Sequence, residues 1–246
     1  MNSTSHNWIV PQWPVPPTVQ ALITTRYGGV STGQYASMNL GDTVGDDPAL
    51  VRENRRRLCL HLPSEPRWLQ QIHGDTVVEA DTVTDLPMAD ASFTLKTDVV
   101  CAIRVADCLP VLLCDRNATS VGAIHAGWRG LCGGAIENTV ARMKVPPAEL
   151  MAYLGPAIGP GAFEVGEDVY SAFVDHDARA EVAFRSHKTG KWFADLFELA
   201  RQRLNNAGVK AIYGGTLCTY SDPARFFSHR RDKVSGRMAA LIWRSG

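Results

Sequence analysis

The stretch that decides the fold is ADCLPVLLCDRNATSVGAIHAGWRG, residues 106–130. It contains two apolar runs, at 109–114 and at 121–124, which a short polar turn separates. Continuous apolar runs of this length are typical of strands that are buried on both faces. We therefore expect a buried β-hairpin. Its antiparallel strands would bring Cys108, before the first strand, and His125, at the end of the second, to the same end of the hairpin.

Patterns typical of strands and of helices alternate on either side of this hairpin. An amphipathic pattern predicts a helix over 46–62, with Asp46 or Asp47 as its cap and Pro48 in the first turn. The stretch 67–80 is expected as two short strands around a turn at 73–75. The alternation predicts a mixed α/β fold with one large core. Further strands are expected within 19–25, 98–115, 119–125, 151–160, 209–220 and 236–244, and further helices within 126–143, 166–174 and 193–208.

The overall composition is that of an ordinary globular protein. The chain has 246 residues, of which 45% are hydrophobic and 20% charged, and its 25 basic and 25 acidic residues give no net charge. This balance provides no strong attraction to nucleic acid or to anionic membranes, so we expect neither as a partner. No linker divides the chain. We expect one domain over 1–246 that begins with an extended, proline-rich segment at 1–18.

The N-terminal sequence and the cysteines indicate a cytoplasmic protein. The N-terminus has no basic region followed by an apolar run, as a signal peptide would, and no stretch is long enough for a transmembrane helix. Six cysteines are present, and without an export signal we expect reduced thiols. No CxxC spacing occurs, so a zinc ribbon or a CxxC redox motif is not supported.

Chemistry-bearing side chains lie at the ends of the expected strands. Cys108 follows Asp107 at the start of one strand, His125 ends another, and His73 lies on the expected turn. Two imidazoles and one thiolate can hold zinc with a fourth position open for water or substrate. Asp107 would then orient a ligand or carry a proton. Alternatively, His125 would activate Cys108 as a nucleophile. Spacing alone does not rank Cys108 above the other cysteines, and a lone histidine is more often structural.

Anion-binding residues are expected among the arginines. The segment FFSHRRDKVSGRM, residues 226–238, places Arg230 before a glycine turn, and the planar guanidinium suits phosphate or carboxylate. Arg52, on the expected helix, and Arg129, at the glycine bend, are rival candidates. The chain contains neither GxxxxGK[ST] nor GxGxxG, so a nucleotide site of the P-loop or Rossmann type is not supported.

Seven segments between about residue 20 and the C-terminus share a family pattern: SMNLGDTVGDDPALVRENRRRL, QIHGDTV, ADASFT, ADCLPVLLCD, AIHAGWRG, YLGPAIGPGAFEVGEDV and FFSHRRDKVSGRMAALIW. The combination of ADCLPV and HAGWRG is the most specific part of the pattern. Together the segments resemble the laccase-domain or YfiH-type family, whose members are also described as polyphenol oxidase, purine nucleoside phosphorylase and peptidoglycan editing factor.

The resemblance implies both a fold and a metal site. The fold would be α/β (α+β), a four-layer α/β/β/α sandwich with mixed sheets, similar to the cytotoxic-necrotizing-factor type of cysteine hydrolase. The family's metal ligands fall by motif on His73 in QIHG, Cys108 in ADC and His125 in HAGWRG. Further motif positions that would line the same pocket and bind substrate or phosphate are Asn39, Arg52 and Arg230.

Three positions depart from the usual family pattern. Gly161 stands where many members have a cysteine after IGP, which argues against an essential thiol there. His229 replaces a tyrosine, so it would either add a titratable group near the pocket or simply replace one ring by another. Ala200 stands where many members have asparagine. We expect these changes to tune the site rather than to abolish it.

The activity that the resemblance implies is a zinc-dependent purine nucleoside phosphorylase acting on adenosine, inosine or methylthioadenosine, with adenosine deaminase activity. Cys108, His125 and Asp107 would be catalytic. Zn²⁺, held by His73, Cys108 and His125, would polarise an oxygen atom of water or substrate. The partners would be small molecules, and we expect a monomer.

Three alternatives remain open at this point. An amidase-type hydrolase would use the same site to edit UDP-linked peptidoglycan precursors. A copper-dependent polyphenol oxidase would agree with the family name, and a Cys/His₂ site can bind Cu²⁺ tightly. However, the seven histidines form no His-x-His pair of the kind that multicopper oxidases need. A non-enzymatic interaction module would leave the polar groups of apolar strands without a purpose.

Overall fold

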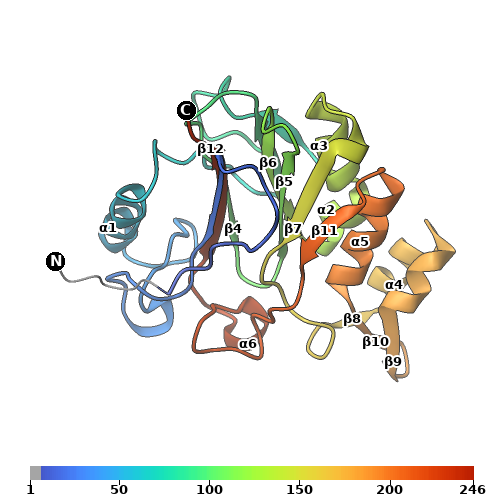
Figure 1. The fold of residues 1–246 in the computed structure, drawn as a ribbon. Helices are drawn as coiled ribbons and strands as arrows, with labels where there is room; N and C mark the ends of the chain where they lie inside the picture. The colour runs from blue at the N-terminus through green and yellow to red at the C-terminus, as the bar shows by residue number, and fades with distance from the viewer. Residues whose placement is uncertain (1–6) are drawn as a thin grey trace.

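A six-stranded mixed sheet forms the centre of the fold in the computed structural model, which describes residues 7–246 (Figure 1). The proline-rich segment expected at 1–18 therefore lies partly outside the described residues. In spatial order the strands are β11 (Ala211–Gly214), β7 (Leu150–Leu154), β5 (Leu109–Asp115), β6 (Val121–Ala126), β3 (Ala91–Thr94) and β2 (Val77–Glu79).

Strands β5 and β6 form the hairpin that the apolar runs predict. They are antiparallel, and Pro110 lies opposite His125. Val111 and Leu113 contribute to the core shared with the helices on one face of the sheet. Leu112 contributes to the core on the other face, where a second sheet packs. Both faces of β5 are thus buried, which explains why its sequence lacks a polar alternation.

The second sheet has three strands, in the order β1 (Val19–Ile23), β12 (Met238–Arg244) and β4 (Cys101–Val105). Helix α1 (Pro48–Cys59) covers its outer face, where Leu58 packs with Leu241. The backbone N–H of Ala49 donates to the Asp47 carboxylate over 2.7 Å, so Asp47 is the helix cap. In Figure 1, α1, the three-stranded sheet, the six-stranded sheet and a group of helices follow one another from left to right.

The helices on the far face of the six-stranded sheet are α2 (Trp128–Gly133), α3 (Ala135–Arg142), α4 (Glu167–Val174) and α5 (Leu196–Asn206). One helix was expected over 126–143, but Gly134 interrupts it with φ 105°, a left-handed conformation that glycine adopts without penalty. The remaining helical elements are α6 (His229–Asp232) and the 3₁₀ turns η1 (Gly33–Tyr35), η2 (Pro147–Glu149) and η3 (Ala178–Ala183).

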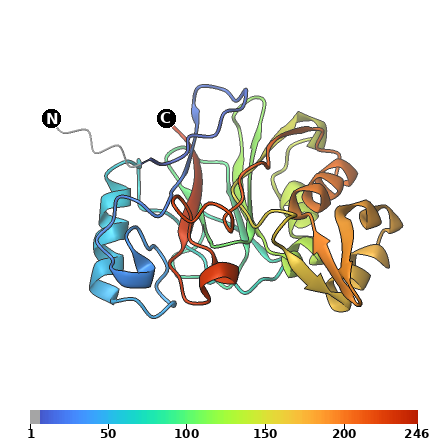
Figure 2. The ribbon, with the colours of Figure 1, turned by 90° about the horizontal axis from the view of Figure 1, so that it is seen from below.

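A small third sheet lies beside α4 and away from the central sheet (Figure 2). Its strands are β8 (Glu164–Gly166), β10 (Lys191–Ala194) and β9 (Phe184–Lys188). The sequence does not predict this sheet, because four of the five residues of β9 are exposed and the strand shows no apolar alternation.

The mixed α/β class is confirmed, whereas the two strands expected within 67–80 are not both present. Only β2 forms there, and Arg67 and Gln70 make isolated bridges. No helix among residues 7–246 combines the length and apolar character that crossing a membrane requires. All six cysteines lie within the described residues, and all are free thiols.

Candidate metal centre

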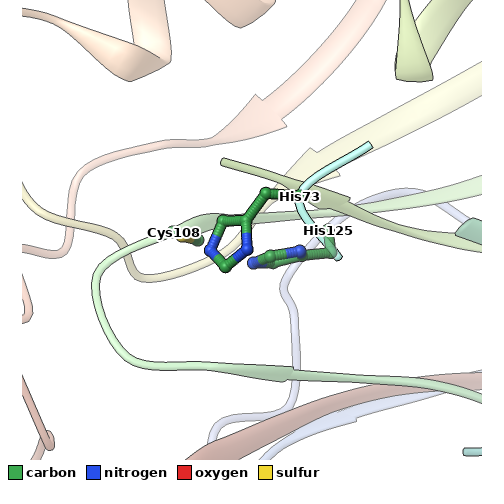
Figure 3. Close-up of side chains that lie close together, drawn as sticks. All are labelled: His73, Cys108 and His125. Carbon is green, nitrogen blue, oxygen red and sulfur yellow. The ribbon is translucent and has the colours of Figure 1, made fainter. Parts of the chain in front are cut away.

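Three side chains from separate elements meet at one end of the six-stranded sheet (Figure 3). His73 comes from the loop before β2, Cys108 directly precedes β5, and His125 lies in β6. Their potential ligand atoms all lie within 4.8 Å of one another. The two imidazole rings meet edge to face, with centroids 4.8 Å apart. The structure therefore brings together the three residues expected as metal ligands, and Cys108 and His125 share one end of the hairpin as predicted.

The position of Cys108 follows from the connection between the two sheets. Residues 106–108 pass from β4 in the three-stranded sheet to β5 in the six-stranded sheet, so Cys108 lies where the sheets separate. Gly127 leaves room for the cluster. A Cβ atom at this position would lie 3.1 Å from Cys108 Sγ and 3.1 Å from His73 Cδ2. The glycine after HA is therefore part of the packing of the site.

The loop that carries His73 is held by a buried carboxylate. His73 has φ 61°, a left-handed conformation that is uncommon for residues other than glycine. Asp90 accepts hydrogen bonds from the backbone N–H groups of Ile72, His73 and Gly74 at 3.1, 2.9 and 2.7 Å. These three bonds stabilise the turn that carries His73.

Asp90 also contacts the second imidazole. Its Oδ1 atom lies 2.7 Å from Nδ1 of His125, and Asp90 is fully buried. With Nδ1 protonated and donating to the carboxylate, Nε2 of His125 is left as the metal-ligating nitrogen. Asp90 was not selected from the sequence, although it lies in the motif ADASFT. Its partners are 16 to 35 residues away, so no local pattern signals its role.

The charges within the cluster favour an ion pair when no metal is bound. Burial by itself raises the pKa of Cys108, but the charge of His125 and hydrogen bonds from both histidines outweigh burial and lower this pKa to about 6. Burial by itself lowers the pKa of His125, but the Cys108 thiolate and the hydrogen bond to Asp90 raise this pKa to about 9. A metal ion at the site would displace the imidazolium proton.

The donor set fits a catalytic zinc ion. Two imidazole nitrogens and one thiolate are common zinc ligands, and three protein ligands leave the fourth position of a tetrahedral ion open. The hydrogen bond between Asp90 and His125 is the kind of outer contact that fixes the tautomer of a ligating histidine. The same nitrogen and sulfur donors also have affinity for copper.

The cluster lines a cavity of about 300 Å³, which is at the lower end of the range for small-molecule sites. The other walls come from the loop around Gly41 and from four polar side chains. Two of these, His229 and Arg237, belong to the C-terminal segment, and the other two are Gln71 and Arg104. The departure from the family pattern at His229 therefore lies at the cavity itself.

The expectation that Asp107 takes part in the chemistry is not supported by its contacts. Asp107 is buried and does not line the cavity. Its carboxylate accepts hydrogen bonds from the Thr219 hydroxyl at 2.6 Å, the Ser228 hydroxyl at 3.0 Å and the Arg230 backbone N–H at 2.7 Å. These contacts attach the C-terminal segment to the connection between β4 and β5.

The three residues expected to bind substrate or phosphate also lie outside the cavity lining. Arg52 is exposed on α1. Arg230 donates from Nη1 to the Glu164 carbonyl at 2.8 Å. Asn39 is fully buried, and its Oδ1 accepts from the backbone N–H of Arg237 at 2.9 Å. The arginines that do line the cavity are Arg104 and Arg237. Arg237 lies in the motif SGRM, but sequence alone does not show which arginine of that segment faces the site.

Comparisons with known proteins show which family and which relatives the chain resembles. A family model described as "Multi-copper polyphenol oxidoreductase laccase" matches residues 20–245. The chain is similar to "Purine nucleoside phosphorylase PA4543" of Pseudomonas aeruginosa, with 53% identity over 96% of this chain and 98% of that protein. It is similar to "Purine nucleoside phosphorylase YfiH" of Escherichia coli, with 52% identity and the same two coverages. The crystal structure of Neisseria meningitidis protein NMB0706 matches with a TM-score of 0.95 and 52% identity, covering 98% of this chain and all of that one.

Proposed function

The chain belongs to the family described as multi-copper polyphenol oxidoreductase laccase, and, because its relatives are named purine nucleoside phosphorylases, we propose that it is a zinc-dependent purine nucleoside phosphorylase that also deaminates adenosine. The observation that carries the proposal is the convergence of His73, Cys108 and His125 on one cavity. The substrates are adenosine, inosine or methylthioadenosine, with phosphate as the second substrate.

The protein's own groups prepare this site for the reaction. Asp90 holds His125 in one tautomer and holds the backbone of the turn that carries His73, so the His125 ring and the His73 backbone are positioned before a ligand arrives. Cys108 is poised as a thiolate by the neighbouring imidazoles. When bound, zinc would supply a Lewis acid that polarises an oxygen atom of water or of the substrate. The cationic wall formed by Arg104 and Arg237 favours an anionic second substrate.

The two reactions differ in what attacks the nucleoside. In phosphorolysis, a phosphate oxygen bonds to the anomeric carbon, the C–N bond to the purine breaks, and the purine leaves with the electron pair. In deamination, water adds to the purine carbon that bears the amino group, and ammonia leaves. One cavity with a metal cluster on one wall and arginines on another is compatible with both reactions.

A single metal centre is favoured over a multicopper centre. Among residues 7–246, His73, Cys108 and His125 are the one group of three or more histidine, cysteine or acidic side chains with the spacing of metal ligands. A multicopper oxidase would need additional histidine-rich sites. The family description therefore does not by itself support a phenol oxidase activity for this chain.

The test is incubation of purified protein with adenosine, with and without phosphate. We expect free adenine and ribose 1-phosphate when phosphate is present, and inosine in both conditions. Cys108→Ala should abolish both products, while Cys114→Ala, in the core between the sheets, should retain them. The proposal is wrong if neither free base nor inosine forms, or if Cys108→Ala behaves like the wild type.

Elemental analysis of protein purified without added copper tests the identity of the metal. We expect about one zinc per chain, since three protein ligands define one site. Full occupancy by copper would contradict the zinc assignment.

A further inference from the structure

Arg237 is the cavity-lining arginine that forms no ion pair within the described chain, although the charges of Asp107 and Cys108 lie near enough to act on it. It forms none of the ion pairs found among residues 7–246. The other arginine of the cavity, Arg104, is paired with Asp42 and donates to the Leu69 carbonyl at 2.7 Å. Burial lowers the pKa of Arg237 despite the charges of Asp107 and Cys108, so a directly bound anion would further stabilise its charged form.

The side chain of Arg237 is fixed by its surroundings. Its backbone N–H donates to Oδ1 of the buried Asn39 at 2.9 Å. Its Nη1 atom donates to the carbonyls of Ser235 at 2.8 Å and Gly236 at 3.1 Å and to the Ser235 hydroxyl at 3.3 Å. A Cβ atom on Gly41 would lie 2.8 Å from Cγ of Arg237, so the stem of the arginine occupies the space that this glycine leaves.

These contacts leave one edge of the guanidinium available. All three side-chain hydrogen bonds of Arg237 within the described chain start from Nη1, and none starts from Nε or Nη2. Nε and Nη2 form a pair of parallel donors, which is the arrangement that binds two oxygens of one phosphate or carboxylate. Because little rotamer freedom remains to be lost, binding of an anion by this edge is pre-organised.

We infer that Nε and Nη2 of Arg237 bind the phosphate that attacks the nucleoside, in the cavity that Cys108 and His125 also line. The inference rests on the proposed phosphorylase function and assigns one of its two substrates to a residue. A hydrogen phosphate held there gives its oxygen to the anomeric carbon as the C–N bond breaks, and its proton ends on the departing purine nitrogen. Asn39, expected to touch substrate, acts instead as a positioning residue for Arg237.

The test compares steady-state kinetics of zinc-loaded variants. We expect Arg237→Gln to raise the KM for phosphate at least about tenfold, as is typical for loss of charged hydrogen bonds, with a change of less than about twofold in the KM for adenosine. Arg237→Lys, which keeps the charge but not the fork, should give an intermediate KM. The control is Arg56→Gln, which removes an exposed guanidinium from α1 and should leave the KM for phosphate unchanged. A wild-type KM for phosphate in Arg237→Gln would overturn the inference.

A second variant keeps the inference testable where Arg237→Gln does not fold. Gly41→Ala retains the charge but displaces the stem of Arg237 by steric contact. We expect a raised KM for phosphate in this variant as well. An unchanged value would contradict the positioning that the inference requires.

Equilibrium titration of the zinc-loaded protein with inorganic phosphate, without nucleoside, separates the inference from the proposed function. If no phosphorolysis occurs but phosphate binds and Arg237→Gln weakens that binding, the phosphate site at Arg237 stands while the proposed function fails. If phosphorolysis occurs and binding is the same in Arg237→Gln, the reverse holds. A parallel titration with uridine diphosphate tests whether Arg237 binds free phosphate or the phosphate group of a nucleotide. Stronger Arg237-dependent binding of the diphosphate than of inorganic phosphate would overturn the assignment to free phosphate.

Discussion

The Oδ1 atom of Asp90 lies 2.7 Å from Nδ1 of His125, and the same carboxylate accepts the backbone N–H of His73 at 2.9 Å. One buried side chain thus orients the imidazole of His125 and holds the backbone of the turn that carries His73. Since the three ligands come from separate elements, this carboxylate is the connection that relates the loop of His73 to the strand of His125.

Replacement of Asp90 by asparagine should weaken metal binding about 10- to 100-fold, the usual cost of removing an outer contact of a metal ligand. The amide cannot provide the charge and all the acceptor positions that the carboxylate provides. Competition with a chromophoric chelator measures the affinity directly. Asp115→Asn is the matched control, because Asp115 is also buried but accepts hydrogen bonds from Thr119 and Ser120 at the other end of the hairpin. It should lower stability without changing metal affinity, and equal affinities in wild type and Asp90→Asn would refute the role of Asp90.

Gly127→Ala should reduce metal binding through steric contact alone. The added methyl group would lie 3.1 Å from both Cys108 Sγ and His73 Cδ2, closer than ordinary van der Waals contact. Gly133→Ala, in the same glycine-rich region, would meet its nearest atom at 3.8 Å and serves as the control. Zinc content after dialysis distinguishes them. If both variants retain one zinc per chain, the packing argument for Gly127 does not hold.

Asp107→Asn should lower the free energy of unfolding by about 1–3 kcal/mol, the range for leaving buried donors without an acceptor. The hydroxyls of Thr219 and Ser228 and the backbone N–H of Arg230 all donate to this carboxylate. Asparagine tolerates the left-handed backbone at this position, where φ is 87°, so strain should add little. Urea unfolding measures the loss, and zinc content should remain at the wild-type level. Loss of zinc with unchanged stability would instead favour a direct role at the metal site.

Alkylation of the metal-free protein should identify Cys108 as the reactive thiol. Its pKa is lowered to about 6, from an ordinary value of 9.0, so the thiolate fraction and the alkylation rate should rise through pH 6 and fall as the thiol is protonated below it. Burial raises the pKa of Cys114 to about 12, so Cys114 should stay unmodified. Mass spectrometry after iodoacetamide treatment at a series of pH values locates the midpoint, and bound zinc should protect Cys108. A midpoint near pH 9 would contradict the ion pair with His125.

The parts of the fold that the sequence predicts are those with local signals. The hairpin of β5 and β6 can be predicted from the sequence because both of its strands are buried on two faces and have unbroken apolar runs. The candidate ligands His73, Cys108 and His125 could be selected because their motifs resemble a known family. By contrast, the contacts of Asp90 and Arg237 depend on distant segments of the chain. The backbone N–H of Arg237 is bonded to a residue 198 positions earlier, which no local pattern reveals.

The contacts of Asp107 likewise could not be predicted from the sequence. In the linear sequence, an aspartate next to a candidate catalytic cysteine is expected to belong to the same site. Where the chain passes from one sheet to the other, the side chains of Asp107 and Cys108 point in different directions. The Asp107 carboxylate faces the C-terminal segment, whereas the Cys108 thiol faces the cavity.

The attachment of the C-terminal segment to Asp107 has a consequence for the order in which the protein is assembled. Thr219, the first residue along the chain that bonds the Asp107 carboxylate, follows Asp107 by 112 residues, and translation of that interval takes on the order of ten seconds. A nascent chain therefore contains His73, Asp90, Cys108 and His125 well before Arg237 leaves the ribosome. All of the candidate metal ligands are thus synthesised before the arginine wall of the cavity is complete, and a molecule shortened before Arg237 would contain every candidate ligand while lacking one of the two arginines of that wall.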